Sequence, residues 1–138
     1  EPDDLPGSAD PEPDDGEDLA RMIARFEASP WAGREPLEVE VAVETVIAGV
    51  AVRGRIDAVF EDGSDVVLVD WKTGAAPRGP QARAQAVQLA VYRLAYSRLR
   101  GLDPERVTTA FYYAGAGRTL VPEPISQAEL ERLVRADA

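Results

Sequence analysis

Three segments with the pattern of β-strands follow one another between residues 37 and 71, separated only by short turns. The first, LEVEVAVE (residues 37–44), alternates apolar and acidic positions, which predicts a half-buried strand with Leu37, Val39, Val41 and Val43 on one face. Ala-Gly at residues 48–49 and Glu-Asp-Gly-Ser at residues 61–64 mark two tight turns. Because tight turns join neighbouring antiparallel strands, these segments predict a three-stranded ribbon and a fold built around a sheet.

The other segments extend this ribbon into a larger sheet with helices. The second strand pattern, residues 50–60, is expected to place Val52, Ile56, Ala58 and Phe60 on one face, and the third, residues 65–71, is apolar on both faces and therefore central. Helices are predicted at residues 17–28, at 81–100 and from 126, and further strands at 106–113 and 118–121. The order α-β-β-β-α-β-β-α predicts an α/β (α+β) three-layer domain, with a mixed central sheet of about five strands flanked by helices.

The composition excludes many kinds of active site. The 138 residues suffice for one domain with a single core. The absence of Cys excludes disulfides, thiolate zinc sites and iron–sulfur clusters, and the absence of His excludes a Ser-His-Asp triad and histidine-ligated metals. No apolar run approaches the roughly 20 residues of a membrane helix and no signal peptide is apparent, so we expect a cytoplasmic protein without a membrane partner. Any chemistry must rest on carboxylates, lysine, tyrosine and oxygen-bound metal ions.

The negative charge is concentrated at the start of the chain. Residues 1–18 carry nine of the 25 acidic residues and no basic residue, so the other 120 residues have a net charge of only -1. Residues 1–16 are rich in Pro, Gly and acid, and we expect them to be a disordered acidic linker before a folded domain at residues 17–138. Because a linker joins two parts and the first residue is Glu1, we expect the chain to be the C-terminal piece of a larger protein.

Two carboxylates and the only lysine are the strongest candidates for chemistry. Asp70 and Lys72 are two residues apart at the end of a strand and share a face. Pairing about the Asp-Gly turn brings Asp57 beside Asp70. Since adjacent carboxylates repel unless a cation lies between them, the pair predicts a site for Mg²⁺ or Mn²⁺, and Lys72 could orient a water molecule or balance charge on a phosphate. The alternative is an exposed strand face with alternating charges.

The long helix supplies two further candidates. Gln88 and Tyr92 are four residues apart on a largely apolar helix and share a face. If that face points toward the strand ends, both side chains could bind a metal-bound water or a phosphate. Alternatively, Tyr92 belongs to the core with its hydroxyl at the boundary, and Gln88 faces solvent.

In combination, GRIDAVF, VVLVDWKTG and QLAVY (residues 54–60, 66–74 and 88–92) resemble the RecB-family nuclease domain of the PD-(D/E)xK superfamily. In sequence, these segments are most similar to the C-terminal nuclease module of actinobacterial UvrD/RecB-like (AdnAB-type) helicase-nucleases. The resemblance implies a restriction-endonuclease-like fold. It also implies an Mg²⁺- or Mn²⁺-dependent exodeoxyribonuclease that is the C-terminal part of an ATP-dependent DNA helicase and acts in DNA recombination and repair. Implied partners are single-stranded DNA, a helicase domain N-terminal in the same chain and a second helicase-nuclease subunit.

Carried over residue by residue, the resemblance makes Asp57 and Asp70 metal ligands and Lys72 the catalytic lysine, with Gln88, Tyr92 and Glu40 as accessory residues. Many relatives have a metal-binding His on an upstream helix, and this chain has none. That helix could lie outside the chain, or Glu40 or Glu27 could replace the His. A weakened site is the third possibility, and it favours the alternative function: a catalytically inactive nuclease fold that guides DNA or docks a partner subunit. A nuclease of the same superfamily acting in restriction or RNA processing is a further alternative.

Overall fold

The computed structural model describes residues 15–137, and the segments follow the predicted order. They are α1 (Asp15–Glu27), β1 (Glu38–Ile47), β2 (Val50–Asp62), β3 (Asp65–Lys72), α2 (Gly79–Arg100), the 3₁₀ turn η1 (Pro104–Arg106), β4 (Val107–Tyr113), β5 (Arg118–Leu120) and α3 (Gln127–Asp137). The first helix begins two residues before its expected start, and the rest of the predicted linker lies outside the described residues.

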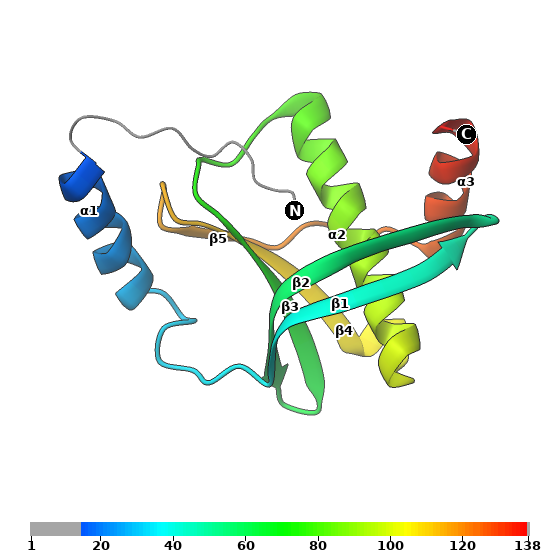
Figure 1. Cartoon of the computed structure of the whole chain (residues 1–138), viewed down its shortest axis with the longest axis horizontal. Helices are drawn as coiled ribbons and strands as arrows, with labels where there is room; N and C mark the ends of the chain where they lie inside the picture. Colours follow the sequence, from blue (N-terminus) through cyan, green and yellow to red (C-terminus); the bar gives the residue numbers. More distant parts are fainter. Residues whose placement is uncertain (1–14, 138) are drawn as a thin grey trace.

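A five-stranded sheet in the order β1-β2-β3-β4-β5 forms the centre of the molecule (Figure 1). Strands β3 and β4 run parallel, and the other neighbours are antiparallel. The long helix α2 makes the crossover from β3 to β4, as a parallel pair requires. The predicted mixed sheet is therefore confirmed, and β3 is its central strand with Val66–Val69 buried.

Two apolar layers cover the faces of this sheet. On one face, Ala95 and Tyr96 of α2 pack against apolar side chains from β1 to β4, and α3 extends this layer. On the other face, Trp31 is buried against Phe60 and its neighbours, and Phe26 at the end of α1 closes the layer. The sheet thus lies between α2 and the segment that follows α1, which confirms the three-layer arrangement.

The alternation of side chains changes at one pair of positions on β1 and β2, which contradicts two face assignments made from the sequence. Ile56 packs under α2 whereas Ala58 packs on the opposite face, and Leu37 and Val39 are 51% and 59% exposed. The strand register continues unchanged from Val39↔Ala58 to Val41↔Ile56. Glu40, between these pairs, has a left-handed backbone with φ +50. The local twist changes which face the side chains occupy, and Asp57 lies at this point.

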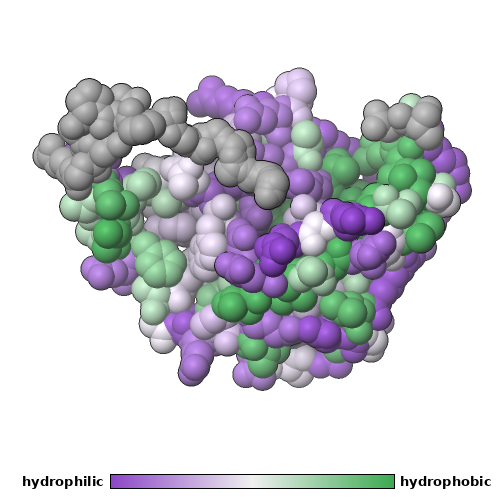
Figure 2. All heavy atoms as spheres, in the orientation of Figure 1, coloured by the Kyte–Doolittle hydropathy of each residue, from purple (hydrophilic) through white to green (hydrophobic). Residues whose placement is uncertain are grey.

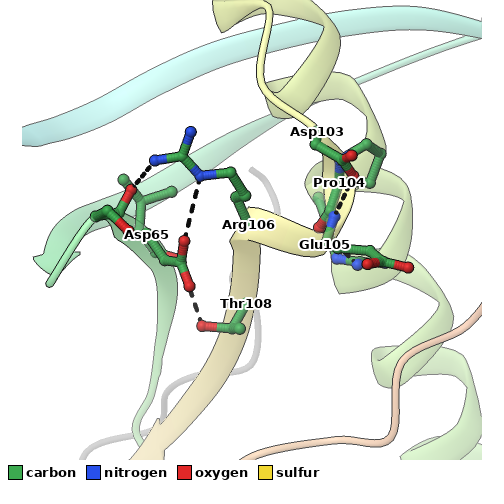
Figure 3. A network of polar contacts seen from close by, with 9 residues as sticks. Asp65, Asp103, Pro104, Glu105, Arg106 and Thr108 are labelled. Carbon is green, nitrogen blue, oxygen red and sulfur yellow. Dashed lines mark hydrogen bonds and ion pairs between the residues drawn. The ribbon is translucent and has the colours of Figure 1, made fainter.

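The far end of the β3–β4 pair is fixed by a polar network (Figure 3). Arg106 Nε donates to Asp65 Oδ1 at 3.3 Å, and Arg106 also bonds the Ser64 carbonyl. Asp65 begins β3 and Arg106 directly precedes β4, so the carboxyl ends of both parallel strands meet at the opposite end of the sheet. The candidate residues Asp70 and Lys72 lie at that end.

Apolar surface remains over α1, at the left of Figure 2. Leu19 and Ile23 of this helix are 53% and 49% exposed, whereas Phe26 packs edge-on against Trp71 and Tyr112. The described part of the chain contains no helix that is long and apolar enough to cross a membrane.

Candidate active site

Asp70 and Lys72 form an ion pair at the end of β3. Lys72 Nζ lies 3.1 Å from Asp70 Oδ2, and the side chains are 29% and 15% exposed, respectively. Although the distance is that of an ion pair, Oδ2 has no hydrogen bond of good geometry within residues 15–137. Because a buried carboxylate oxygen without a hydrogen bond is costly, this atom is the strongest indication of a ligand-binding site.

Asp57 lies beside this pair, as the turn between β2 and β3 predicts. The last recorded pair of the ladder is Ala58↔Val69, so the next positions outward are Asp57 and Asp70. Asp57 Oδ2 accepts a hydrogen bond of 2.9 Å from the backbone N–H of Trp71. This bond fixes Asp57 against the end of β3, so the structure brings Asp57, Asp70 and Lys72 together.

The surroundings of Asp70 favour its neutral form. The pKa of this carboxyl is raised from 3.8 to about 6, and burial is the largest cause. The charge and hydrogen bonding of Lys72 act in the opposite direction, whereas the charge and hydrogen bonding of Asp57 act in the same direction as burial. The neighbouring lysine is therefore not sufficient to compensate for burial and for the second carboxylate.

These properties fit a divalent cation. Mg²⁺ commonly binds one or two protein carboxylates and fills its other positions with waters and phosphate oxygens. Asp57 and Asp70 would supply the two carboxylates, and the buried Oδ2 of Asp70 would be one ligand atom. Among the described residues, no group of three or more acidic side chains could hold a metal. The residues present thus fit an ion that keeps several non-protein ligands.

Tyr92 reaches the carboxylates from α2 because of a glycine on β2. A Cβ atom added at Gly54 would lie 2.1 Å from Tyr92 Cε1 and 2.5 Å from its hydroxyl oxygen, so the ring occupies the space that any other residue would need. Burial, followed by the charges of Asp70 and Asp57, raises the pKa of Tyr92. The hydroxyl therefore lies within the electrostatic influence of both carboxylates and remains a hydrogen-bond donor at neutral pH.

Gln88 and Glu40 are exposed and do not join the group formed by Asp57, Asp70 and Lys72. Gln88 is exposed on α2, one turn before Tyr92. Glu40 stands across from Asp57 in the β1–β2 register, but its side chain is exposed and does not form a metal-binding group with the two aspartates. Glu27, suggested as a substitute for the missing His, is exposed at the end of α1 and joins no such group either.

Two residues near the site were missed from the sequence. Tyr113, at the end of β4, is buried and pairs with Lys72 in the ladder, and its hydroxyl donates to Gln85 Oε1 at 2.9 Å. Burial, followed by the charge of Asp70, raises the pKa of Tyr113 to about 12. Gln85 lies two helical turns before Tyr92 and on the same face of α2, so the seven-residue spacing could have indicated that Gln85 is near the site.

Comparison with known proteins gives a family match over most of the chain. Residues 9–136 match the family described as the PD-(D/E)XK nuclease superfamily. The match covers all the strands and the three residues Asp57, Asp70 and Lys72.

A curated relative and a solved structure are also similar. The chain is 38% identical over 88 residues to one subunit of the ATP-dependent helicase/nuclease of Anoxybacillus flavithermus (strain DSM 21510 / WK1), an alignment that covers 60% of this chain and 7% of that protein. A crystal structure of a candidate exonuclease from Eubacterium rectale superposes with a TM-score of 0.59 at 14% identity, covering 88% of this chain and 49% of the other. At this identity the structural likeness shows the shared fold.

Proposed function

The chain belongs to the PD-(D/E)XK nuclease superfamily, and we propose that it is a metal-dependent deoxyribonuclease module that processes DNA ends in recombination and repair. The observation that carries the proposal is the buried Asp70 Oδ2, which lacks a hydrogen bond among the described residues and lies beside Asp57 and Lys72. An acidic pair with one ammonium group suits phosphodiester hydrolysis, because the carboxylates can hold a divalent cation and the ammonium group can balance negative charge on the phosphate.

The proposed roles follow from the chemistry of each side chain. Asp57 and Asp70 would hold Mg²⁺ or Mn²⁺, which when bound polarises a phosphate and lowers the pKa of a coordinated water. Lys72, held near Asp70, can orient the attacking water or balance the negative charge that develops on the phosphate. The Tyr92 hydroxyl can donate a hydrogen bond to a phosphate oxygen beside the aspartates. Gln88 and Glu40 have accessory roles in this proposal.

The proposed context is the C-terminal part of an ATP-dependent helicase-nuclease. The similarity to one subunit of an ATP-dependent helicase/nuclease supports it, and the chain spans only 7% of that relative. In this context a helicase domain N-terminal in the same protein delivers single-stranded DNA to the site, and a second helicase-nuclease subunit is the partner. The acidic composition of residues 1–16 suits a linker between the two domains.

A second candidate is a catalytically inactive module that guides DNA or docks a partner protein. It is favoured by the presence of only two acidic side chains in the candidate site of the described chain, without a third ligand. The two functions differ in one property, since both allow DNA binding but only the nuclease hydrolyses a phosphodiester bond.

The test is cleavage of a 5′-labelled single-stranded oligodeoxynucleotide with Mg²⁺ or Mn²⁺, and with EDTA. The nuclease proposal predicts metal-dependent products from the wild type and none from Asp70→Ala. Asp62→Ala is a matched control, because Asp62 is an exposed aspartate in the β2–β3 turn, at the other end of the same strand pair. No metal-dependent product from the wild type would favour the inactive module, and preferential cleavage of the RNA of the same sequence would favour RNA processing.

A further inference from the structure

From Lys72 on β3, the sheet continues through β4 to its edge strand β5, and the strand register shows which face each side chain of these strands occupies. Trp71, Tyr112 and Thr119 are direct neighbours across β3, β4 and β5. Trp71 and Tyr112 contact Phe26 of α1, and Thr119 accepts a 3.1 Å hydrogen bond from the Trp31 ring N–H. All three side chains therefore point to the face covered by α1 and Trp31.

The next row across the same strands must point to the opposite face, because successive side chains alternate. It consists of Lys72, Tyr113 and Arg118. The contact of Tyr113 with Gln85 of α2 confirms that this row faces α2. Since neighbouring strands are about 4.8 Å apart, the Cα atoms of Lys72 and Arg118 are separated by about 10 Å on the face that carries Asp70.

Arg118 has no interaction partner among the described residues. Its side chain is exposed, and it makes no hydrogen bond and no ion pair with any residue of the described chain. Arg78, the N-cap residue of α2, is exposed and equally without such a contact, and it lies two residues after Ala76, which packs against Phe111 and Tyr113 of β4. The register thus places Arg118 at the β5 edge, and the contact of Ala76 with β4 places the start of α2 next to the neighbouring strand.

The opposite edge of the sheet places an acidic side chain beside the site. Of the three acidic residues of β1, Glu38 and Glu44 are paired with Arg100 and Arg53, whereas the register puts the exposed Glu40 across from Asp57. A polyanion that approached the aspartates over β1 would meet Glu40 before reaching them. The side of β4 and β5 presents arginine instead, whose planar guanidinium binds phosphate through two parallel hydrogen bonds.

We infer that the β4–β5 edge is the path of the nucleic-acid strand, with Arg118 binding a phosphate next to the one held at Asp57, Asp70 and Lys72. This inference rests on the proposed function. It assigns to Arg118 a role in substrate binding and none in the chemical step, because the arginine stands two strands away from Lys72. Arg78 contributes a second, weaker contact to the same strand.

The test compares Arg118→Ala with Arg53→Ala in binding and in cleavage of a 12-nucleotide single-stranded DNA. Arg53 is a matched control, because its side chain is 81% exposed and its nearest acidic partner, Glu44, is 3.9 Å away on the acidic side of the sheet. Binding is measured by fluorescence anisotropy in an Asp70→Asn background that does not cleave. Arg118→Ala should raise Kd about fivefold and reduce the salt dependence by about 0.7 in log Kd per log salt, the value of one phosphate contact on a single strand.

Cleavage by the variants in the wild-type background separates binding from chemistry. Arg118→Ala should raise KM several-fold with kcat nearly unchanged, and adding Arg78→Ala should raise KM further. Equal Kd, KM and salt dependence for the Arg118→Ala and Arg53→Ala variants, in a protein that still cleaves DNA, would overturn the path while leaving the nuclease function intact. A wild type that neither binds nor cleaves DNA would overturn both.

Discussion

Lys72 lies against a buried carboxylate at the end of β3. It is the only lysine among 15 basic residues, its ammonium group lies 3.1 Å from a buried carboxylate oxygen, and its side chain is 29% exposed. Arginine presents a wide, planar fork, whereas lysine presents a compact charge that fits a narrow space. The position therefore favours a role that depends on the size of the cation as well as on its charge.

If Lys72 is catalytic, Lys72→Ala should lower kcat for DNA cleavage about a hundredfold or more, comparable to the loss of a charge-stabilising donor in other active sites. Lys72→Arg should fail nearly as badly. Both variants should keep the fold and the metal affinity, because the carboxylates provide the metal ligands. The measurement is single-turnover cleavage, with circular dichroism as the control for folding. Cleavage by Lys72→Arg at the rate of the wild type would contradict the catalytic role of Lys72.

Contacts between individual residues could be predicted from the sequence where the strand ladder determines them. The turn at residues 61–64 sets the register, and the register places Asp57 beside Asp70. The register could not predict the hydrogen bond between Tyr113 and Gln85, because that contact depends on how α2 lies across the sheet. The importance of Gly54 was also not predictable, since it arises from the Tyr92 ring that fills the space of a side chain.

At the element scale, the turn between β4 and β5 supports the loop that follows Lys72. The Ala114 N–H donates to the Lys72 carbonyl at 2.7 Å. A Cβ atom added at Gly115 would lie 2.8 Å from the Thr73 carbonyl oxygen and 3.2 Å from that of Gly74. The turn and the loop are therefore packed backbone against backbone, and a side chain at residue 115 must move one of them.

Gly115→Ala should consequently displace the loop and lower cleavage more than it lowers stability. We expect kcat to fall about tenfold or more, since small displacements of catalytic groups have large effects. Gly33→Ala is the matched control, because an added Cβ there meets nothing within 4 Å and both glycines lack a left-handed backbone. The measurement is kcat together with the melting temperature. Equal kcat for both variants would show that the turn does not position Lys72.

Element order, strand pairing and the central place of β3 were predictable, because hydrophobic periodicity and turn residues are local signals. The change of face at Glu40 and Asp57 was not predictable. A strict alternation of apolar and acidic residues continues through Glu40, so nothing in the pattern indicates a left-handed residue there. The change of face coincides with a tertiary contact, in which Tyr96 and Arg100 of α2 donate hydrogen bonds to Glu38, and a contact between distant segments is not visible in a local pattern.

The site reduces the stability of the whole fold when no metal is bound. Asp70 has a pKa of about 6 in the folded protein, above its ordinary value of 3.8. The folded state therefore binds this proton more tightly than the unfolded state does. The penalty for ionised Asp70 is absent below about pH 4, grows as the pH rises to 6, and is fully present above it.

Asp70→Asn should remove that penalty. In EDTA at pH 8 the variant should be more stable than the wild type by up to about 3 kcal/mol, which corresponds to an increase in Tm of up to about 10 °C, and the difference should vanish near pH 4. Thermal unfolding of both proteins from pH 4 to pH 8 is the measurement. Asp62→Asn is the exposed control and should change Tm little. A constant difference between Asp70→Asn and the wild type at all pH values would contradict this account.

The proposed divalent-cation site consists of Asp57 and Asp70, with Lys72 beside it and not among its ligands. Calorimetric titration with Mn²⁺ measures this site alone, because it needs neither DNA nor a helicase. We expect saturable binding to the wild type and to Lys72→Ala, and loss of binding in Asp57→Asn and Asp70→Asn. Binding that is unchanged in both asparagine variants, or absent from the wild type, would contradict this proposal.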